Sequence, residues 1–292
     1  MLLAGEMGAT VPATHTLKQS ALSQMTADQS TIMHSAAEIV PGDVSGGTNT
    51  SHTIVVAALA ALLDAVPAAA PPHAYERAVL EANVLGKDTD GARRRTYRYL
   101  RELYLLRPDS LLFRALRDLW PVDPSARPLL AGLCALARDA VFRASCPAIA
   151  GSAPGDTLSS TDLANAVGER FPASYGASTL AKIGRNTFSS WEQTGHLSDA
   201  GYAEKLRTRP VCRPADAAYA LLLGHIEGAR GRALFDTRWA RMLDQPISHL
   251  LDLAAAASQQ GMLELRVAGG IVEVGFRELL RPFDDVGTGR LL

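Results

Sequence analysis

Arginines gather between Lys87 and Arg107 in a pattern suited to phosphate binding. This stretch holds seven basic residues and three acidic ones, whereas the whole chain has a formal net charge of −1. Guanidinium groups match the geometry of phosphate oxygens, and binding a polyanion releases its condensed counterions. The pattern indicates a contact surface for a polyanion, although the same charges could simply solvate a helix. The candidate contact residues are Lys87, Arg93, Arg94, Arg95, Arg98 and Arg101.

The spacing of these arginines predicts a helix that follows another helix after a short turn. A helix is expected over 75–84, Gly86 can end it, and Thr89 or Asp90 can cap the next helix through a side-chain oxygen. In the second helix, arginines and apolar residues fall on opposite faces. This outline resembles a helix-turn-helix, whose second helix usually enters the DNA major groove. The apolar face is formed by Tyr97, Leu100 and Tyr104.

A second helix, turn and helix is predicted over 160–194. The later helix has one apolar face and one face of side chains that can contact base edges or phosphates, although a solvent-facing surface would look similar. An extended segment containing Lys205, Arg207, Arg209 and Arg213 follows and could serve as a wing. The candidate contact residues on this helix are Lys182, Arg185, Asn186 and Ser189.

The elements that must position these residues are mainly helical. Hydrophobic residues make up 47% of the 292-residue chain and aromatic residues only 6%, a balance typical of packed helices. We therefore expect a mainly α, multi-helical fold with helix-turn-helix or winged-helix-like units. A small C-terminal β-hairpin should turn at Gly269 and Gly270, because apolar residues alternate on both sides of this pair.

Four segments are expected along the chain, with a boundary at the glycines and proline of 151–155. A disordered, low-complexity leader covers 1–50, although an overextended start site would give the same pattern. A helical domain with the basic helix-turn-helix covers 51–150. A winged-helix-like domain covers 156–213, and helices plus the hairpin cover 214–292.

No familiar catalytic or phosphate-loop motif occurs, which favours a protein that is not an enzyme and has no cofactor. The three cysteines lack metal-site spacing, so we expect no metal and inert thiols. His196 and His225 are expected to be structural. The longest apolar run, 53–66, is shorter than the about 20 residues that a membrane helix needs, and no secretory signal is visible. We therefore expect a cytoplasmic protein without a membrane partner.

Scattered positions between residues 75 and 210 resemble the BrxA family of BREX phage-resistance systems. They include Tyr75-Glu76-Arg77, Leu80–Leu85, Lys87 with Thr89, and Arg93–Arg95. Further along, Ser178-Thr179-Leu180, Ile183, Arg185-Asn186 and Gly195-His196-Leu197 also resemble that family. The low-complexity leader and the C-terminal helix with its hairpin depart from the family pattern.

The resemblance implies a small, mostly helical, non-enzymatic component of a bacterial defence locus, with a fold likened to a helical RNA-binding antitermination protein. Its partners would be nucleic acid and other defence-system proteins. The leading hypothesis is an accessory protein that binds double-stranded DNA. The alternatives are an interaction scaffold within a defence complex and an RNA-binding protein.

Overall fold

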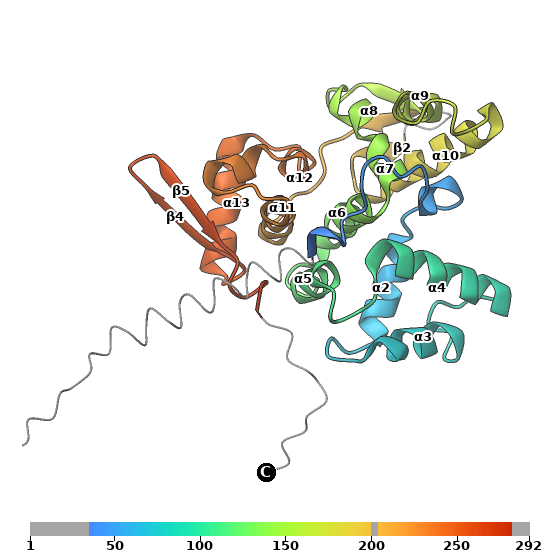
Figure 1. Ribbon diagram of the computed structural model, residues 1–292, viewed down its shortest axis with the longest axis horizontal. Coiled ribbons are helices and arrows are strands. Elements are labelled where there is room, and N and C mark those ends of the chain that lie inside the picture. Colours follow the sequence, from blue (N-terminus) through green and yellow to red (C-terminus); the bar gives the residue numbers. More distant parts are fainter. Residues whose placement is uncertain (1–34, 200–203, 282–292) are drawn as a thin grey trace, which may run out of the picture.

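Helices dominate the computed structural model, which describes residues 35–199 and 204–281 (Figure 1). The helices are α2 (Val56–Ala65), α3 (Pro72–Leu80), α4 (Asp90–Tyr104), α5 (Leu111–Leu119), α6 (Arg127–Arg138), α7 (Ala140–Ala144), α8 (Cys146–Ala150), α9 (Ser160–Arg170), α10 (Ala177–Gln193), α11 (Pro214–Ile226), α12 (Arg238–Arg241) and α13 (Ile247–Gln259). Short 3-10 helices are η1 (Thr48–Thr50), η2 (Pro124–Ala126) and η3 (Gly231–Asp236). The predicted mainly α fold is confirmed.

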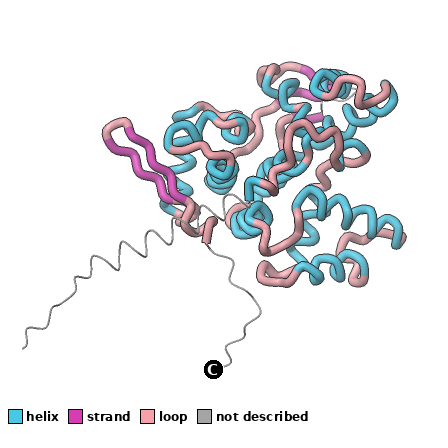
Figure 2. Tube along the Cα trace, in the orientation of Figure 1, coloured by secondary structure: helices cyan, strands magenta, loops and turns pink. Residues whose placement is uncertain are grey.

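Two small antiparallel sheets complete the fold (Figure 2). The first contains β1 (Thr157–Ser159), β2 (Leu197–Asp199) and β3 (Glu204–Arg207) in the order β1-β3-β2. The second is the predicted hairpin of β4 (Glu264–Ala268) and β5 (Ile271–Gly275), which projects from the helical body. Gly269 and Gly270 both have positive φ, at 55° and 82°, as the tight turn requires.

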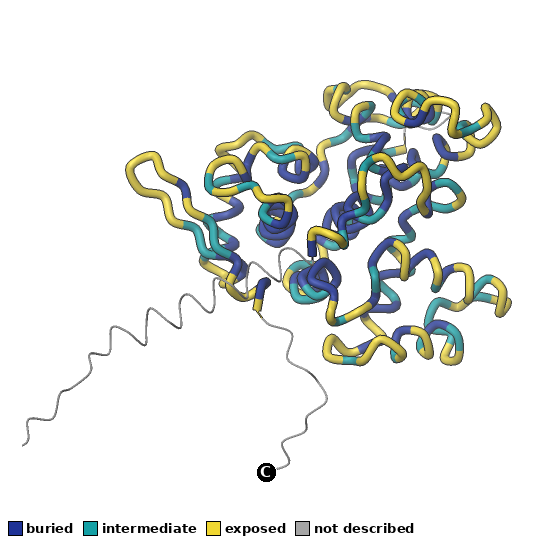
Figure 3. The backbone as a smooth tube through the Cα atoms, in the orientation of Figure 1, coloured by how far each residue is buried: buried dark blue, intermediate teal, exposed yellow. Residues whose placement is uncertain are grey.

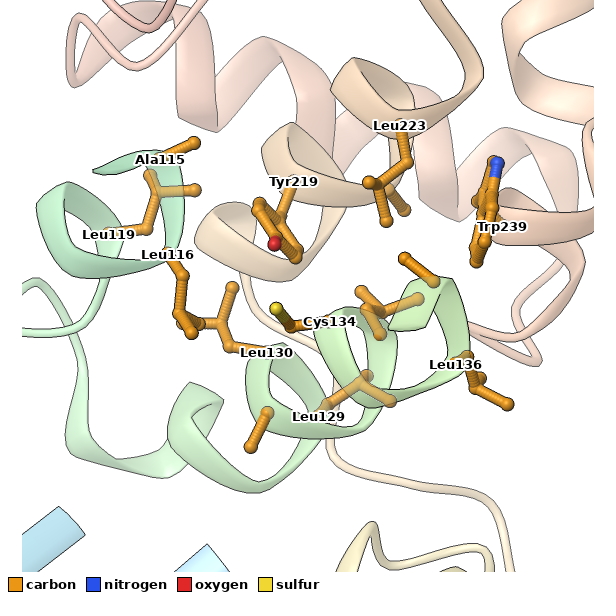
Figure 4. Packing of buried hydrophobic residues seen from close by; sticks show 14 of the residues in the cluster. Ala115, Leu116, Leu119, Leu129, Leu130, Cys134, Leu136, Tyr219, Leu223 and Trp239 are labelled. Carbon is orange, nitrogen blue, oxygen red and sulfur yellow. The ribbon is translucent and has the colours of Figure 1, made fainter. Parts of the chain in front are cut away.

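The core is centred on α6 and α11, whose residues are buried on nearly every side. Apolar side chains of α5, α6, α11 and α12 interleave there (Figure 4). Leu130 and Cys134 of α6 face the space occupied by Tyr219 of α11, whose hydroxyl donates to Leu112 O at 3.0 Å. Two helices apolar all round must lie inside a molecule, so α6 and α11 set the positions of the outer helices.

A single hydrophobic cluster crosses the boundary predicted at 151–155. Its members run from Ile39 to Leu280 and include Leu163 and Trp191 of the predicted winged-helix-like segment. A smaller cluster joins α7, α9 and α10. The glycines and proline do end the helical run, but the three later segments share one core.

The structure also differs from the leader predicted over 1–50. Residues 35–50 pack on the helical body: Val40 N donates to Ala137 O at 2.9 Å, and Thr48 and Asn49 are buried (Figure 3). The amino-acid composition of residues 35–50 did not predict this packing, because polar residues of this segment form hydrogen bonds with distant helices. Residues 1–34 of the predicted leader lie outside the described residues.

Asp139 separates two consecutive helices. Apolar residues recur at near-helical spacing over 128–142, yet α6 ends at Arg138 and α7 starts at Ala140. Asp139 between them has extended backbone angles and caps α7, since its carboxylate accepts from Phe142 N at 2.9 Å. In the described parts of the chain, every helix is too short or too polar to cross a membrane.

Candidate nucleic-acid interface

The segment from β1 to β3 forms the predicted winged-helix-like unit. Strand β1 is followed by the packed helices α9 and α10, and β2 and β3 return to pair with β1 in the order β1-β3-β2. Ser159 and Asp162 form a reciprocal capping box that starts α9 directly after β1. Gly184 lets the two helices approach, because a Cβ there would lie 2.2 Å from Ser160 O. In such units the second of the two helices is the one presented to DNA.

Helix α10 has the two faces expected from its sequence. Ile183, Thr187 and Trp191 are buried on the inner face. Lys182 and Arg185 are exposed, and neither makes an ion pair with any residue in the described ranges. The open part of α10 therefore carries two uncompensated positive charges, which is the electrostatic requirement for a phosphate contact.

Asn186 does not have the predicted role. Residues 45–56, which we call the N-terminal strap, lie along α10 and form hydrogen bonds with its side chains. Asn186 Nδ2 donates to Asn49 O at 3.0 Å, and Val56 N donates to Gln193 Oε1 at 3.0 Å. One donor of the Asn186 amide therefore holds the strap in place of contacting a ligand. Ser189 is half-buried beside this contact.

The basic residues expected to form a wing lie in ion pairs within the molecule. Arg207 is only 3% exposed and pairs with Asp244 at 2.9 Å. Lys205 pairs with Glu192, and Arg209 with Asp244 at 3.8 Å. Arg213 lies 3.4 Å from Asp123. Three carboxylates thus face four cations, so this segment is less basic than its sequence alone indicates. The strands of the predicted wing are present.

The first helix-turn-helix is also present, as α3 and α4. Asn83 closes the turn, since its side chain accepts from Lys87 N at 2.9 Å and donates to Lys87 O at 3.1 Å. Thr89 caps α4 by accepting from Ala92 N, as predicted. Gly86 has a φ of 60°, but α3 already ends at Leu80. The turn is therefore rigid and longer than a minimal one.

The arginines of α4 divide into paired and unpaired groups. Arg93 pairs with Asp90, and Arg98 lies 3.7 Å from Glu102. The remaining three are exposed and make no ion pair within residues 35–199 and 204–281. This unpaired group consists of Arg94, Arg95 and Arg101. Lys87, in the turn, is half-buried and uses its backbone for the Asn83 contacts.

The strap connects the two basic helices. Thr48 Oγ1 donates to Glu102 Oε2 of α4 at 2.9 Å, while the next residue, Asn49, contacts α10. The His52 ring lies 4.7 Å from the Tyr99 ring of α4, between ring centres. Figure 1 shows α4 and α10 on the same side of the molecule as the strap. The two helices that carry the unpaired cations thus both contact the strap.

A buried polar network fixes the strap. Asp139 Oδ2 accepts from Asn49 N at 2.8 Å and from Asn49 Nδ2 at 3.1 Å. Ser190 Oγ donates to Asn49 Oδ1 at 2.8 Å. Burial raises the pKa of the Asp139 carboxyl, and the hydrogen bonds from Phe142 and Asn49 oppose that rise. This carboxylate therefore joins the strap to the start of α7.

The environments of His196 and His225 both favour the neutral ring. His196 is 1% exposed, and its ring contacts Thr194 Oγ1 at 2.7 Å and Met242 O at 2.9 Å. Burial lowers the pKa of His196 to about 3, and that of His225 to about 4. Both rings are therefore neutral at physiological pH, and neither contributes a positive charge there.

The cysteines have the environment of unreactive thiols. Burial raises the pKa of Cys134 and of Cys146 to about 12, and it also raises the pKa of Cys212. Thiolates, which are the reactive form, are therefore scarce at neutral pH. Within the described ranges, no cluster of histidine, cysteine and acidic side chains is arranged to hold a metal ion.

Comparison with protein-family models, with curated proteins and with solved structures finds no match for this chain.

Proposed function

We propose that this protein binds nucleic acid, with double-stranded DNA as the favoured ligand, and is a non-enzymatic cytoplasmic protein. The observation that carries the proposal is the position of Lys182 and Arg185 on the open face of α10 in a winged-helix-like unit. A polyanion would supply the negative charge that this face lacks. Helix α4, which carries the unpaired arginines, lies on the same side of the molecule as α10 and would offer a second contact surface (Figure 1). A role beside other proteins of a BREX-type defence system rests on the sequence resemblance alone.

The test is fluorescence anisotropy of labelled duplex DNA, with single-stranded DNA and duplex RNA as parallel ligands, across a salt series. Lys182→Glu with Arg185→Glu should abolish binding at low salt. The matched control reverses two exposed arginines of the C-terminal part, Arg232→Glu with Arg266→Glu, and changes the net charge equally. If both double variants lose binding to the same extent, net charge and not α10 is responsible, and the proposed site fails. Preference for duplex RNA would move the proposal to the RNA-binding alternative.

The internal ion pairs of the predicted wing favour a second candidate function, an interaction scaffold. Asp199 and Glu204 stand on β2 and β3, so this edge does not match a phosphate backbone. The hairpin exposes Val267 and Ile271, at 60% and 67%. In this case the arginine face of α4 would meet an acidic protein surface. Arg94→Glu, Arg98→Glu and Arg101→Glu together would then disrupt partner assembly while leaving any duplex binding through α10 intact.

A further inference from the structure

Three arginines line a hollow of 450 Å³ between α7, α8, α9 and α12. Arg143 comes from α7, Arg170 from the end of α9, and Arg238 from the start of α12. Glu169 is the one acidic residue in its described lining. The hollow is therefore a site for an anion by its charge and by its concave shape.

The three guanidinium groups have different neighbours. Arg143 donates to the carbonyl oxygens of Leu136 and Ala137 near the end of α6 and to that of Val40, and no carboxylate lies within ion-pair distance of it among the described residues. The Arg170 Nη2 atom would lie 3.7 Å from a Cβ on Gly42, which places it against the backbone at the hollow's edge. Arg170 makes no ion pair within the described part of the chain.

Arg238 is fixed by Glu227, which accepts from it and from Trp239 Nε1, the latter at 2.8 Å. Two carboxylates, Glu169 and Glu227, thus stand against three guanidinium groups. Burial, together with the neighbouring charge of Arg238, lowers the pKa of Arg143 to about 10. Arg143 remains charged at neutral pH, so an anion in the hollow would relieve the repulsion between the two guanidiniums.

A second hollow of 310 Å³ adjoins the first and shares Arg143 and Arg238 with it. Its lining is mostly apolar and includes Leu136, Trp239 and Met242. Ligand pockets of small molecules typically measure about 300–1,000 Å³ and combine apolar walls with a few polar groups. The two hollows together have this character.

We propose that the two hollows bind one small phosphorylated ligand with an apolar or aromatic body, as in a nucleotide. Its phosphates contact Arg143, Arg170 and Arg238, and its ring lies in the apolar hollow beside Trp239 and Met242. Arginine is suited to this role because its fork pairs with two phosphate oxygens at once. No residue of α4 or α10 is among the described lining of either hollow. The site is therefore separate from the proposed nucleic-acid surface.

The test is calorimetric titration of the full chain with ATP, inorganic pyrophosphate and adenosine, without added metal. ATP should bind most tightly, pyrophosphate more weakly, and adenosine weakest. Arg170→Glu should weaken ATP binding at least tenfold. This variant should fold, because Arg170 is exposed and has no ion pair within residues 35–199 and 204–281. Thermal unfolding monitors its fold, and ATP should raise the Tm of the wild type more than that of the variant.

The matched control is Lys182→Glu with Arg185→Glu, which should retain ATP binding while losing duplex DNA binding. Equal loss of ATP affinity in this control would show a general charge effect and overturn the site. Absence of both ATP and pyrophosphate binding would also overturn it, whatever the result with DNA. Equal affinities for ATP and pyrophosphate would overturn the role of the apolar hollow.

Discussion

At the scale of single residues, His196 gives the clearest link between an environment and a property. Its ring is enclosed and hydrogen-bonded, and burial lowers its pKa to about 3 from an ordinary value of 6.5. In the unfolded chain His196 therefore binds a proton below pH 6.5, whereas in the folded protein it does so only below about pH 3. The resulting stability is present above pH 6.5 and is lost as the pH falls through this range.

This linkage predicts a pH-dependent stability that the variant His196→Gln lacks. Below pH 6.5 the free energy of unfolding of the wild type should fall by up to about 1.4 kcal/mol per pH unit from this group. Asp139 acts in the opposite sense, since burial raises its pKa. The measurement is therefore the difference between wild type and variant in urea unfolding from pH 7 to pH 4. A difference that does not change with pH would contradict it.

Gly184 makes a second prediction at this scale. Gly184→Ala should destabilise the protein by about 1–3 kcal/mol, because the new Cβ would overlap Ser160 O and overpacking forces the backbone apart. Gly168→Ala on the facing helix is the control, since its Cβ would lie 3.5 Å from Leu180 Cδ1 in ordinary contact. Urea unfolding should show the control unchanged or slightly stabilised. Equal losses in both variants would count against the close crossing as the cause.

At the scale of elements, the strap is the segment that joins the two basic helices. It makes no regular structure beyond η1, so its position depends on side-chain hydrogen bonds to Asp139, Asn186 and Ser190. A buried polar group that loses its hydrogen-bond partner destabilises a protein by more than an exposed hydrogen bond stabilises it. The strap should therefore be sensitive to one residue, Asn49.

Asn49→Ala should cost about 1–3 kcal/mol of stability and increase amide exchange over residues 45–54. It leaves the buried Asp139 carboxylate and the Ser190 hydroxyl with fewer partners. Thr50→Ala is the control, because that hydroxyl donates only to Gly47 O in an exposed turn. Exchange that stays slow over the strap in Asn49→Ala would show that backbone contacts alone hold it.

At the scale of the whole molecule, the continuous core ties the winged-helix-like unit to the rest. Leu163, Phe188 and Trp191 belong to the same cluster as α6 and α11. Excised as 156–213, the unit would expose these side chains to water. We expect this fragment to lack cooperative thermal unfolding by circular dichroism, whereas 35–281 should unfold cooperatively. A sharp transition in the short fragment would show an independent domain.

The proposed nucleic-acid surface also predicts a property of the whole molecule. Each phosphate contact contributes about 0.9 to the slope of log K against log salt for duplex DNA. Lys182→Ala with Arg185→Ala should therefore reduce the slope by about 1.8, and further losses should follow from Arg94→Ala and Arg101→Ala if one duplex spans both helices. Anisotropy at several salt concentrations measures this. An unchanged slope in the α4 variants would confine the contact to α10.

The sequence by itself determined the features that depend on near neighbours. Leu100 and Tyr104 on the apolar face of α4, its Thr89 cap and the Gly269-Gly270 turn involve residues only a few positions apart, so periodicity and capping rules predicted them. The buried face of α4 is centred on Tyr99, Leu100 and Leu103, and Tyr97 lies at its edge, only partly buried. The division of α10 into an apolar and a polar face was predicted for the same reason. Lys182 and Arg185 were predicted as contact residues on that polar face, but local rules could not predict that both lack an ion pair within the described residues.

Only the tertiary structure decided which charged and polar residues remain available to a ligand. Arg207 pairs with Asp244, and Asn186 holds Asn49, across separations that no local pattern encodes. The same holds for the shared core and for the three arginines that meet at the hollow beside α9. A polar or charged side chain that is removed from water needs a hydrogen-bond or ionic partner, and the fold supplies such partners from distant parts of the chain. Lys182 and Arg185 keep their charges exposed because the fold brings no carboxylate among the described residues within ion-pair distance of them.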